Sequence, residues 1–150
     1  EKACNKAPVC GEQYQRKISG PILDRFDINI EVPPIDYESL NSMHNSQNNE
    51  EASKQVYERV DNARKLQKQR YEGHGIDLNK DLEGQLLIDY AMPYGKAADL
   101  LNDAAKKFKF SMRGYNRILK VARTIADLEA CNRVNEYHIS EALSFRGFSL

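Results

Sequence analysis

The sequence has no tryptophan, only three cysteines and no excess of charge of either sign, since Lys plus Arg and Asp plus Glu both number 22. The zero net charge argues against a strongly basic nucleic-acid module and against an acidic tail. No apolar run approaches the ~20 residues that a membrane span requires, and the polar, charged start does not resemble a signal peptide. Cys4, Cys10 and Cys131 are too scattered for a disulfide framework, so we expect a reducing, cytoplasmic setting.

The pattern of apolar residues changes after the first third of the chain. Ile28, Ile30 and Val32 alternate with polar residues, which predicts a short strand that ends at two prolines. Residues 41–53 consist mostly of Asn, Ser, Gln and Glu, and this composition indicates a flexible linker over about 36–55. The first residue is not Met, and we expect the chain to be part of a longer protein.

Helical patterns dominate the region after the linker. The apolar spacing of Val56, Val60 and Ala63 predicts a helix that runs to about residue 71. Further helices are predicted at about 80–91, 96–108 and 111–130, and a fifth helix is predicted after Asn135. Ser111 and Asn135 are good N-caps for the fourth and fifth helices. The predicted fold class is therefore mainly α, with a small helical bundle over 56–150 and one strand before it.

Two resemblances to nucleotide-binding motifs fail on inspection. Gly95 and Lys96 could belong to a phosphate-binding loop, but Tyr90 stands where this loop needs its first Gly and Ala97 where it needs Ser or Thr. Residues 86–89 could resemble a magnesium-binding strand, but Tyr90 follows instead of a second carboxylate and the local pattern is helical. The histidines and cysteines also lack the spacing of a metal site, and we expect no metal site in this chain.

Two arginines and their neighbours are the candidate site residues. Arg113, Arg117 and Lys120 lie within one stripe of the predicted fourth helix, with Arg123 at its margin. This stripe is either a solvated basic face or a surface in which Arg113 contacts a phosphate, which a guanidinium can bind bidentately. Arg25 lies between two aspartates, so it is either a surface ion pair or an arginine finger for a neighbouring subunit. Residue type alone does not decide between these hypotheses.

Four segments resemble one family, the bacterial magnesium-chelatase-like AAA+ ATPases, which includes competence proteins. Residues 18–28 read ISGPILDRFDI and resemble the family motif ISGPLLDRIDI. Residues 58–70 resemble R-V-x-x-A-R-x-x-Q-x-x-R, and residues 111–128 are similar to SARAYHRILRVARTIADL, with Met112 and Gly114 in place of two alanines. Residues 138–146 resemble the closing H-I-x-E-A-L-x-Y-R. A C-x-C pair of the family is incomplete, because Lys6 replaces its second cysteine.

The resemblance implies a function for a longer parent protein. Residues 1–35 would be a fragment of the ATPase core, and residues 56–150 the lid. Arg25 would be the arginine finger acting in trans, supported by Asp24, and Arg113 the sensor-2 residue that contacts ATP in cis, supported by Arg117. The resemblance implies that the parent uses ATP and Mg²⁺ in a homo-oligomeric, hexameric ring. This chain alone would bind neither, because it lacks the phosphate-binding loop and the magnesium carboxylates.

The resemblance does not decide which molecule the ATPase acts on. A DNA branch-migration motor is the first hypothesis, with DNA bound outside this chain. A chelatase-type ATPase that remodels a protein partner for metal insertion is the second. The isolated chain would be a monomeric, non-catalytic helical interaction module without a membrane partner.

Overall fold

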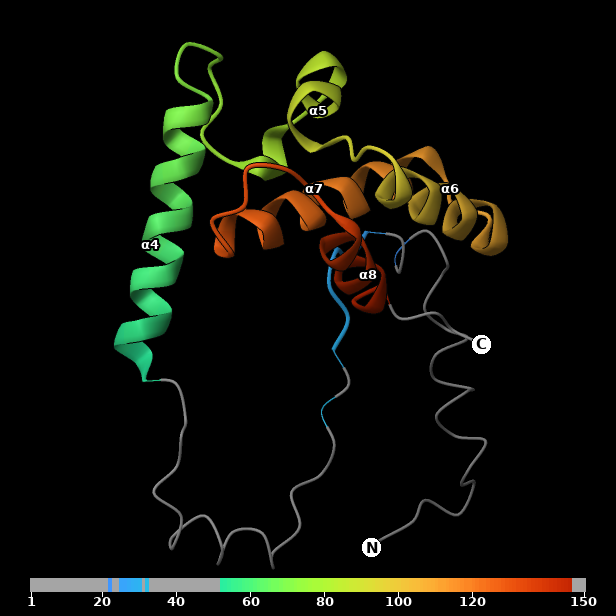
Figure 1. Cartoon of the computed structure of the whole chain (residues 1–150), viewed down its shortest axis with the longest axis horizontal. Coiled ribbons are helices and arrows are strands. Elements are labelled where there is room, and N and C mark those ends of the chain that lie inside the picture. Colours follow the sequence, from blue (N-terminus) through green and yellow to red (C-terminus); the bar gives the residue numbers. More distant parts are fainter. Residues whose placement is uncertain (1–21, 23–24, 31, 33–51, 147–150) are drawn as a thin grey trace, which may run out of the picture.

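The computed structural model describes residues 22, 25–30, 32 and 52–146. The described part is mainly helical, as predicted. Figure 1 shows the helices arranged around one central helix, α7, that runs across the molecule. The elements are, in chain order, α4 (Ser53–Arg70), the 3-10 turn η1 (Asn79–Asp81), α5 (Gly84–Ala91), α6 (Lys96–Phe108), α7 (Met112–Leu128) and α8 (Glu136–Ser144).

Helix α7 organises the hydrophobic core. It packs against α4, η1, α5 and α8, and α6 packs in turn against α8. Its apolar face buries Ile118, Leu119, Ala122 and Ala126, as the helical spacing predicts. The other elements contribute the remaining buried side chains, which include Tyr71, Leu82, Leu87, Ala91, Leu101 and Ile139.

Side-chain caps fix the starts of the last two helices. The Ser111 hydroxyl accepts a hydrogen bond from the Gly114 N–H at 3.0 Å, and the Asn135 side chain accepts one from the His138 N–H at 3.1 Å. Each cap satisfies an N–H group that a helix start otherwise leaves without a partner. Helix α7 ends at Leu128, slightly before the predicted end, because Ala130 has a left-handed φ of 54°. Both predicted caps are therefore confirmed.

The second predicted helix is divided in two. Residues 79–81 form η1, and the chain is extended at Leu82 and Glu83 before α5 begins. Gly84 has a φ of 52°, a conformation that interrupts a continuous helix and that glycine adopts at little cost. The break lets Leu82 enter the core, where it is fully buried.

Helix α4 packs along only part of its length. Ala63 and Gln67 are buried against α7, whereas Val56 and Val60 are 38% and 43% exposed. Figure 1 shows the N-terminal half of α4 extending away from the other helices. The predicted helix is therefore formed, but Val56 and Val60 stay partly exposed because no described element lies against this half. The helix also begins at Ser53, inside the range predicted for the linker, and residues 36–51 of that range lie outside the described residues.

The predicted strand is not formed in the described residues 25–30 and 32. A strand needs a ladder of hydrogen bonds to a neighbouring strand. Here the Asn29 N–H instead donates to the carbonyl of Phe145 at the end of α8, at 2.6 Å. The alternating apolar side chains consequently stay exposed, up to 82% for Val32. Within the described part of the chain, no helix has the length and apolar character to cross a membrane.

Candidate functional site

Arg113 lies in the first turn of α7, directly after the Ser111 cap. The residue is exposed, and its guanidinium has no hydrogen bond or ion pair with another described residue. A helix start carries partial positive charge and N–H groups that favour anions. The guanidinium is thus available to an anionic ligand such as a phosphate group.

Gly114 allows the end of α8 to approach the start of α7. The Arg146 guanidinium lies 4.9 Å from the centre of the Phe110 ring, a cation–π geometry. A Cβ atom on residue 114 would lie only 2.6 Å from the Arg146 Nη1 atom. Glycine at this position weakens the helix start by up to ~1 kcal/mol relative to Ala. The structure supplies a reason for the glycine, because any side chain here would displace Arg146.

Arg117, one turn further along α7, forms an ion pair. Its Nε atom lies 3.2 Å from the Oδ1 atom of Asp27, and its side chain is 19% exposed. Asp27 follows Arg25 by two residues, so the pair brings the predicted finger segment next to the predicted sensor-2 helix. Arg25 itself is exposed, and its N–H donates to the carbonyl of Ile22 in a turn. Asp24 lies outside the described residues.

The rest of the predicted basic stripe is not a uniform solvated face. The Lys120 ammonium group donates to the carbonyl of Lys80 at 2.9 Å, which connects α7 with η1. Arg123 is buried, with 1% of its side chain exposed. Its guanidinium bonds to the Asp127 carboxylate and to the carbonyls of Cys131 and Asn132. The sequence placed Arg123 at the edge of the exposed stripe, and the structure corrects this to an interior position.

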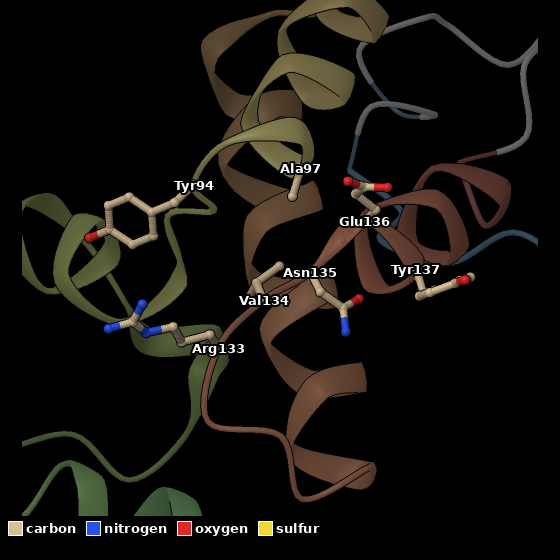
Figure 2. Close-up of a pocket in the computed structure, with 7 residues that line it drawn as sticks. All are labelled: Tyr94, Ala97, Arg133, Val134, Asn135, Glu136 and Tyr137. Carbon is tan, nitrogen blue, oxygen red and sulfur yellow. The ribbon is translucent and has the colours of Figure 1, made fainter.

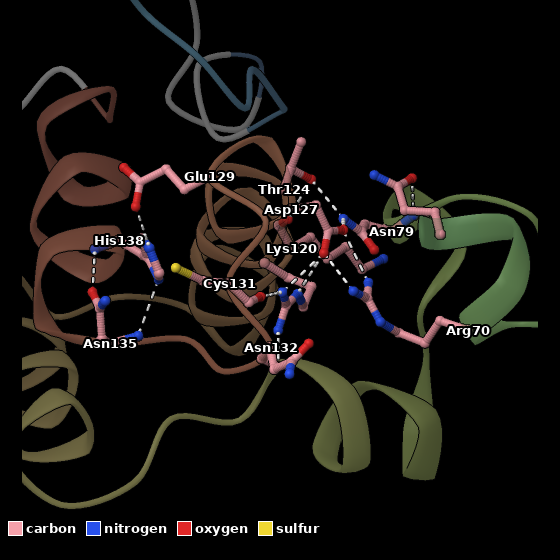
Figure 3. Close-up of polar contacts among 12 residues, drawn as sticks. Arg70, Asn79, Lys120, Thr124, Asp127, Glu129, Cys131, Asn132, Asn135 and His138 are labelled. Carbon is pink, nitrogen blue, oxygen red and sulfur yellow. Dashed lines mark hydrogen bonds and ion pairs between the residues drawn. The ribbon is translucent and has the colours of Figure 1, made fainter. Parts of the chain in front are cut away.

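Asp127 is the centre of a buried polar network that joins α4, η1 and α7 (Figure 3). Its carboxylate accepts two hydrogen bonds from Arg70, two from Arg123 and one from Asn79, at 2.5–3.2 Å. The Asn79 side chain also accepts from the Tyr71 hydroxyl at 2.5 Å. Every buried side-chain nitrogen and oxygen in the described residues has a hydrogen-bond partner. The network is therefore fully satisfied, as a buried ionic cluster must be to remain stable.

The charges in this network stabilise one another. Burial alone would raise the pKa of Asp127, but hydrogen bonds from Arg70 and Asn79 and the positive charge of Arg123 outweigh it and lower the pKa. Burial lowers the pKa of Arg123 more than the Asp127 charge raises it. For Arg70, burial lowers the pKa, but the hydrogen bond to Asp127 and its other interactions raise it overall. Both guanidinium groups stay charged, because arginine cannot be deprotonated in proteins.

The spacing of four residues in the sequence is a signal for this network. Gln67 and Arg70 are three residues apart, and Arg123 and Asp127 are four apart, so each pair shares a helix face. All four residues occur in the family motifs quoted above. Gln67 accepts a hydrogen bond from the Asn79 N–H at 3.3 Å. These motif positions therefore serve the packing of α4 against α7.

A second polar cluster brings together His138, Glu129 and Cys131, although their spacing in the sequence indicated no metal site. One possible ligand atom from each lies within 4.8 Å of the others. The Asn135 N–H donates to His138 Nδ1 at 3.1 Å, so the ring proton belongs on Nε2, which faces Glu129 Oε2 at 2.9 Å. A metal at Nε2 would need the opposite arrangement, with the proton on Nδ1. The cluster therefore fits a hydrogen-bonded cap of α8 rather than a metal centre.

Among the hollows that the described residues form, two lie close to residues of interest for binding. Figure 2 shows the first, of 460 Å³, lined by Tyr94 and Tyr137, which are both well exposed, and by Arg133 and Asn135. The second, of 540 Å³, lies beside Arg117 and is bordered by the segment that contains Asp27 and Ile28. Neither contains a phosphate-binding loop. Gly95 and Lys96 open α6, but Ala97 is buried there and offers no hydroxyl for magnesium.

Comparison with known proteins identifies the family. The sequence-family model for the C-terminal part of magnesium chelatase subunit ChlI matches residues 50–146, and the family model for subunit ChlI matches residues 1–40. The chain belongs to the magnesium chelatase ChlI family. The resemblance that was read from the motifs is thereby confirmed.

Among curated proteins, the competence protein ComM of Haemophilus influenzae is 39% identical over 89% of the chain. The protein YifB of Salmonella typhimurium is 37% identical over 89%, and Mb2921c of Mycobacterium bovis is 33% identical over 95%. The aligned regions cover 25–27% of these proteins, so the ChlI-family chain spans about a quarter of their length.

Proposed function

We propose that this chain is the lid portion of a ring-forming AAA+ ATPase, with Arg113 as the sensor-2 residue and Arg25 as the arginine finger. The exposed guanidinium of Arg113 at the start of α7 is the observation that carries the proposal. Arg123 and Arg117 are held by carboxylates, whereas Arg113 has no such partner among the described residues. Arg25 is exposed in the same way. Both residues can therefore reach a phosphate supplied by another part of the ring.

The chemistry follows from charge. Bound ATP with Mg²⁺ supplies the phosphoryl group, on which negative charge is redistributed during transfer. Arg113 would place a planar, bidentate donor against phosphate oxygens in its own subunit, and Arg25 would do so from the neighbouring subunit. The sequence lacks a phosphate-binding loop, so the remainder of the parent protein would supply the phosphate cradle and the metal site. We also propose that the parent protein forms a hexameric ring in the cytoplasm.

A mixed-ring experiment on the full-length protein tests both roles. We expect Arg113→Ala to lower turnover at least ~10-fold and Arg25→Ala at least ~100-fold, because each removes positive charge from the transition state. Subunits that carry Arg25→Ala and lack the lysine of the phosphate loop should inhibit adjacent wild-type sites. The matching Arg113→Ala subunits should only dilute activity. Turnover within about a factor of two of wild type in both single variants would identify the arginines as surface charges and refute the proposal.

We propose that the parent ATPase acts on DNA, because the chain is similar to the competence protein ComM. The parent would then be a branch-migration motor that contacts DNA outside this chain. The family description favours the second candidate, a chelatase-type ATPase that remodels a protein partner. An ATPase assay of the full-length protein with and without branched DNA separates the two. Stimulation by DNA supports the motor, and stimulation by a protein partner but not by DNA supports the chelatase-type function.

A further inference from the structure

The segment that carries Arg25 is attached to the lid at two points. The Asp27 carboxylate pairs with the Arg117 guanidinium of α7 at 3.2 Å. Two residues later, the Asn29 N–H donates to the Phe145 carbonyl at 2.6 Å, and its side-chain amide donates to the Arg146 carbonyl at 3.5 Å. The first attachment is to the middle of α7 and the second to the end of α8. Two attachments two residues apart fix both the position and the direction of the segment.

The path from Arg113 to Arg25 is short and consists of described residues. Arg113 and Arg117 are four residues apart on α7, which is about one helical turn. Arg117 contacts Asp27, and Asp27 is two residues from Arg25. Helices α7 and α8 pack together, and Ile118, Ile139 and Ala142 belong to one hydrophobic core, so the two attachment points belong to one packed unit. A rotation of this unit would carry the finger segment with it.

We propose that the Arg117–Asp27 pair couples the two arginines, so that the sensor-2 helix sets the position of the finger. Arg117 is then a positioning residue, which acts through Asp27 and not by contact with phosphate. The inference rests on the proposed function of Arg25 and Arg113. Closure of α7 over nucleotide in one subunit would move Arg25 toward the nucleotide of the next. This contact gives the ring a route by which one site senses its neighbour.

Charge exchange in the full-length protein tests the coupling. We expect Arg117→Glu and Asp27→Lys each to lower turnover at least ~10-fold with the KM for ATP within about twofold, since a misplacement of ~1 Å costs up to ~100-fold. The exchanged double variant should recover to within about threefold of wild type. Lys120→Glu is the matched control, because Lys120 lies nearby on the same helix and bonds to the Lys80 carbonyl instead. It should keep turnover within about twofold.

Mixed rings give a second measurement that does not depend on rescue. Arg117→Glu subunits without their own phosphate-loop lysine should inhibit neighbouring wild-type sites, as Arg25→Ala subunits do. If Arg117→Glu only dilutes activity, as expected for Arg113→Ala, Arg117 acts in its own site and the coupling is refuted. Normal turnover of Arg117→Glu beside inactive Arg25→Ala and Arg113→Ala also refutes the coupling, but leaves the proposed function intact. Normal turnover of Arg25→Ala and Arg113→Ala refutes the proposed function itself.

Discussion

Replacement of Asp127 by Asn should destabilise the fold more than any exposed charge change. The substitution keeps the size of the side chain and removes the negative charge that pairs with Arg70 and Arg123. An Asn amide offers one acceptor oxygen where the carboxylate offers two, and its NH₂ group would face donors of the network. The two guanidinium groups would then lie close together without a counter-ion.

The expected magnitude follows from burial. The side chains of Arg70 and Arg123 are 17% and 1% exposed and Asp127 is fully buried, so solvent screens these charges little. Removal of one partner from a buried ion pair costs ~3–5 kcal/mol. Small domains have free energies of unfolding of ~5–15 kcal/mol, so a loss of about 3 kcal/mol would remove a large part of the total stability.

Urea denaturation followed by far-ultraviolet circular dichroism measures this loss, since the chain has no tryptophan to report by fluorescence. Asp103→Asn is the matched control. Asp103 lies 4.0 Å from Lys106, and both side chains are at least 80% exposed, so solvent reduces its expected contribution to below ~0.5 kcal/mol. A loss below about 1 kcal/mol for Asp127→Asn, or a loss equal to that of the control, would refute the claim that the network stabilises the fold through its charges.

Three further predictions concern pH, capping and nucleotide. Hydrogen bonds and nearby cations outweigh burial and lower the pKa of Asp127 in the folded chain. The stabilisation by its charge should therefore be present above about pH 5 and be lost as the pH falls below ~4 through the folded pKa. In urea titrations from pH 6 to 3, the free energy of unfolding should change less with pH in Asp127→Asn than in the wild type. Asn135→Ala should cost ~1 kcal/mol and speed amide exchange at the start of α8, whereas Asn132→Ala, which removes no side-chain cap, should change exchange little. The isolated chain should not hydrolyse ATP and should bind it weakly or not at all, and micromolar affinity by calorimetry would contradict the expected weak binding.

Local patterns predicted the helices well. Ser111 and Asn135 act as caps through bonds to residues three positions along the chain, so their role is visible in a short stretch of sequence. The apolar spacing of α7 likewise reports its buried face. These features depend on neighbours within one or two turns, which a single sequence contains in full.

Features that depend on distant residues were missed. Arg123 looked solvated because its helical angle places it at the edge of the basic stripe, yet Arg70 and Asp127 together make a buried site for charge. Arg70 and Asp127 are 57 positions apart in the sequence. The reason for Gly114 is likewise distant in the sequence, because Arg146 lies against it. For the site, resemblance selected Arg25 and Arg113, and the residues alone left both open.

The two groups of charges on α7 separate stability from function. Arg123 and Asp127 lie in its C-terminal half and connect it to α4, whereas Arg113 and Arg117 lie in its first two turns, nearer the finger segment. Exposed substitutions usually change stability by less than ~0.5 kcal/mol, so Arg113→Ala should lower turnover at nearly unchanged stability. Asp127→Asn should lower stability while leaving turnover of the folded fraction close to normal. Both effects from either substitution would mean that the network and the site are one cooperative unit, and the division along α7 would be wrong.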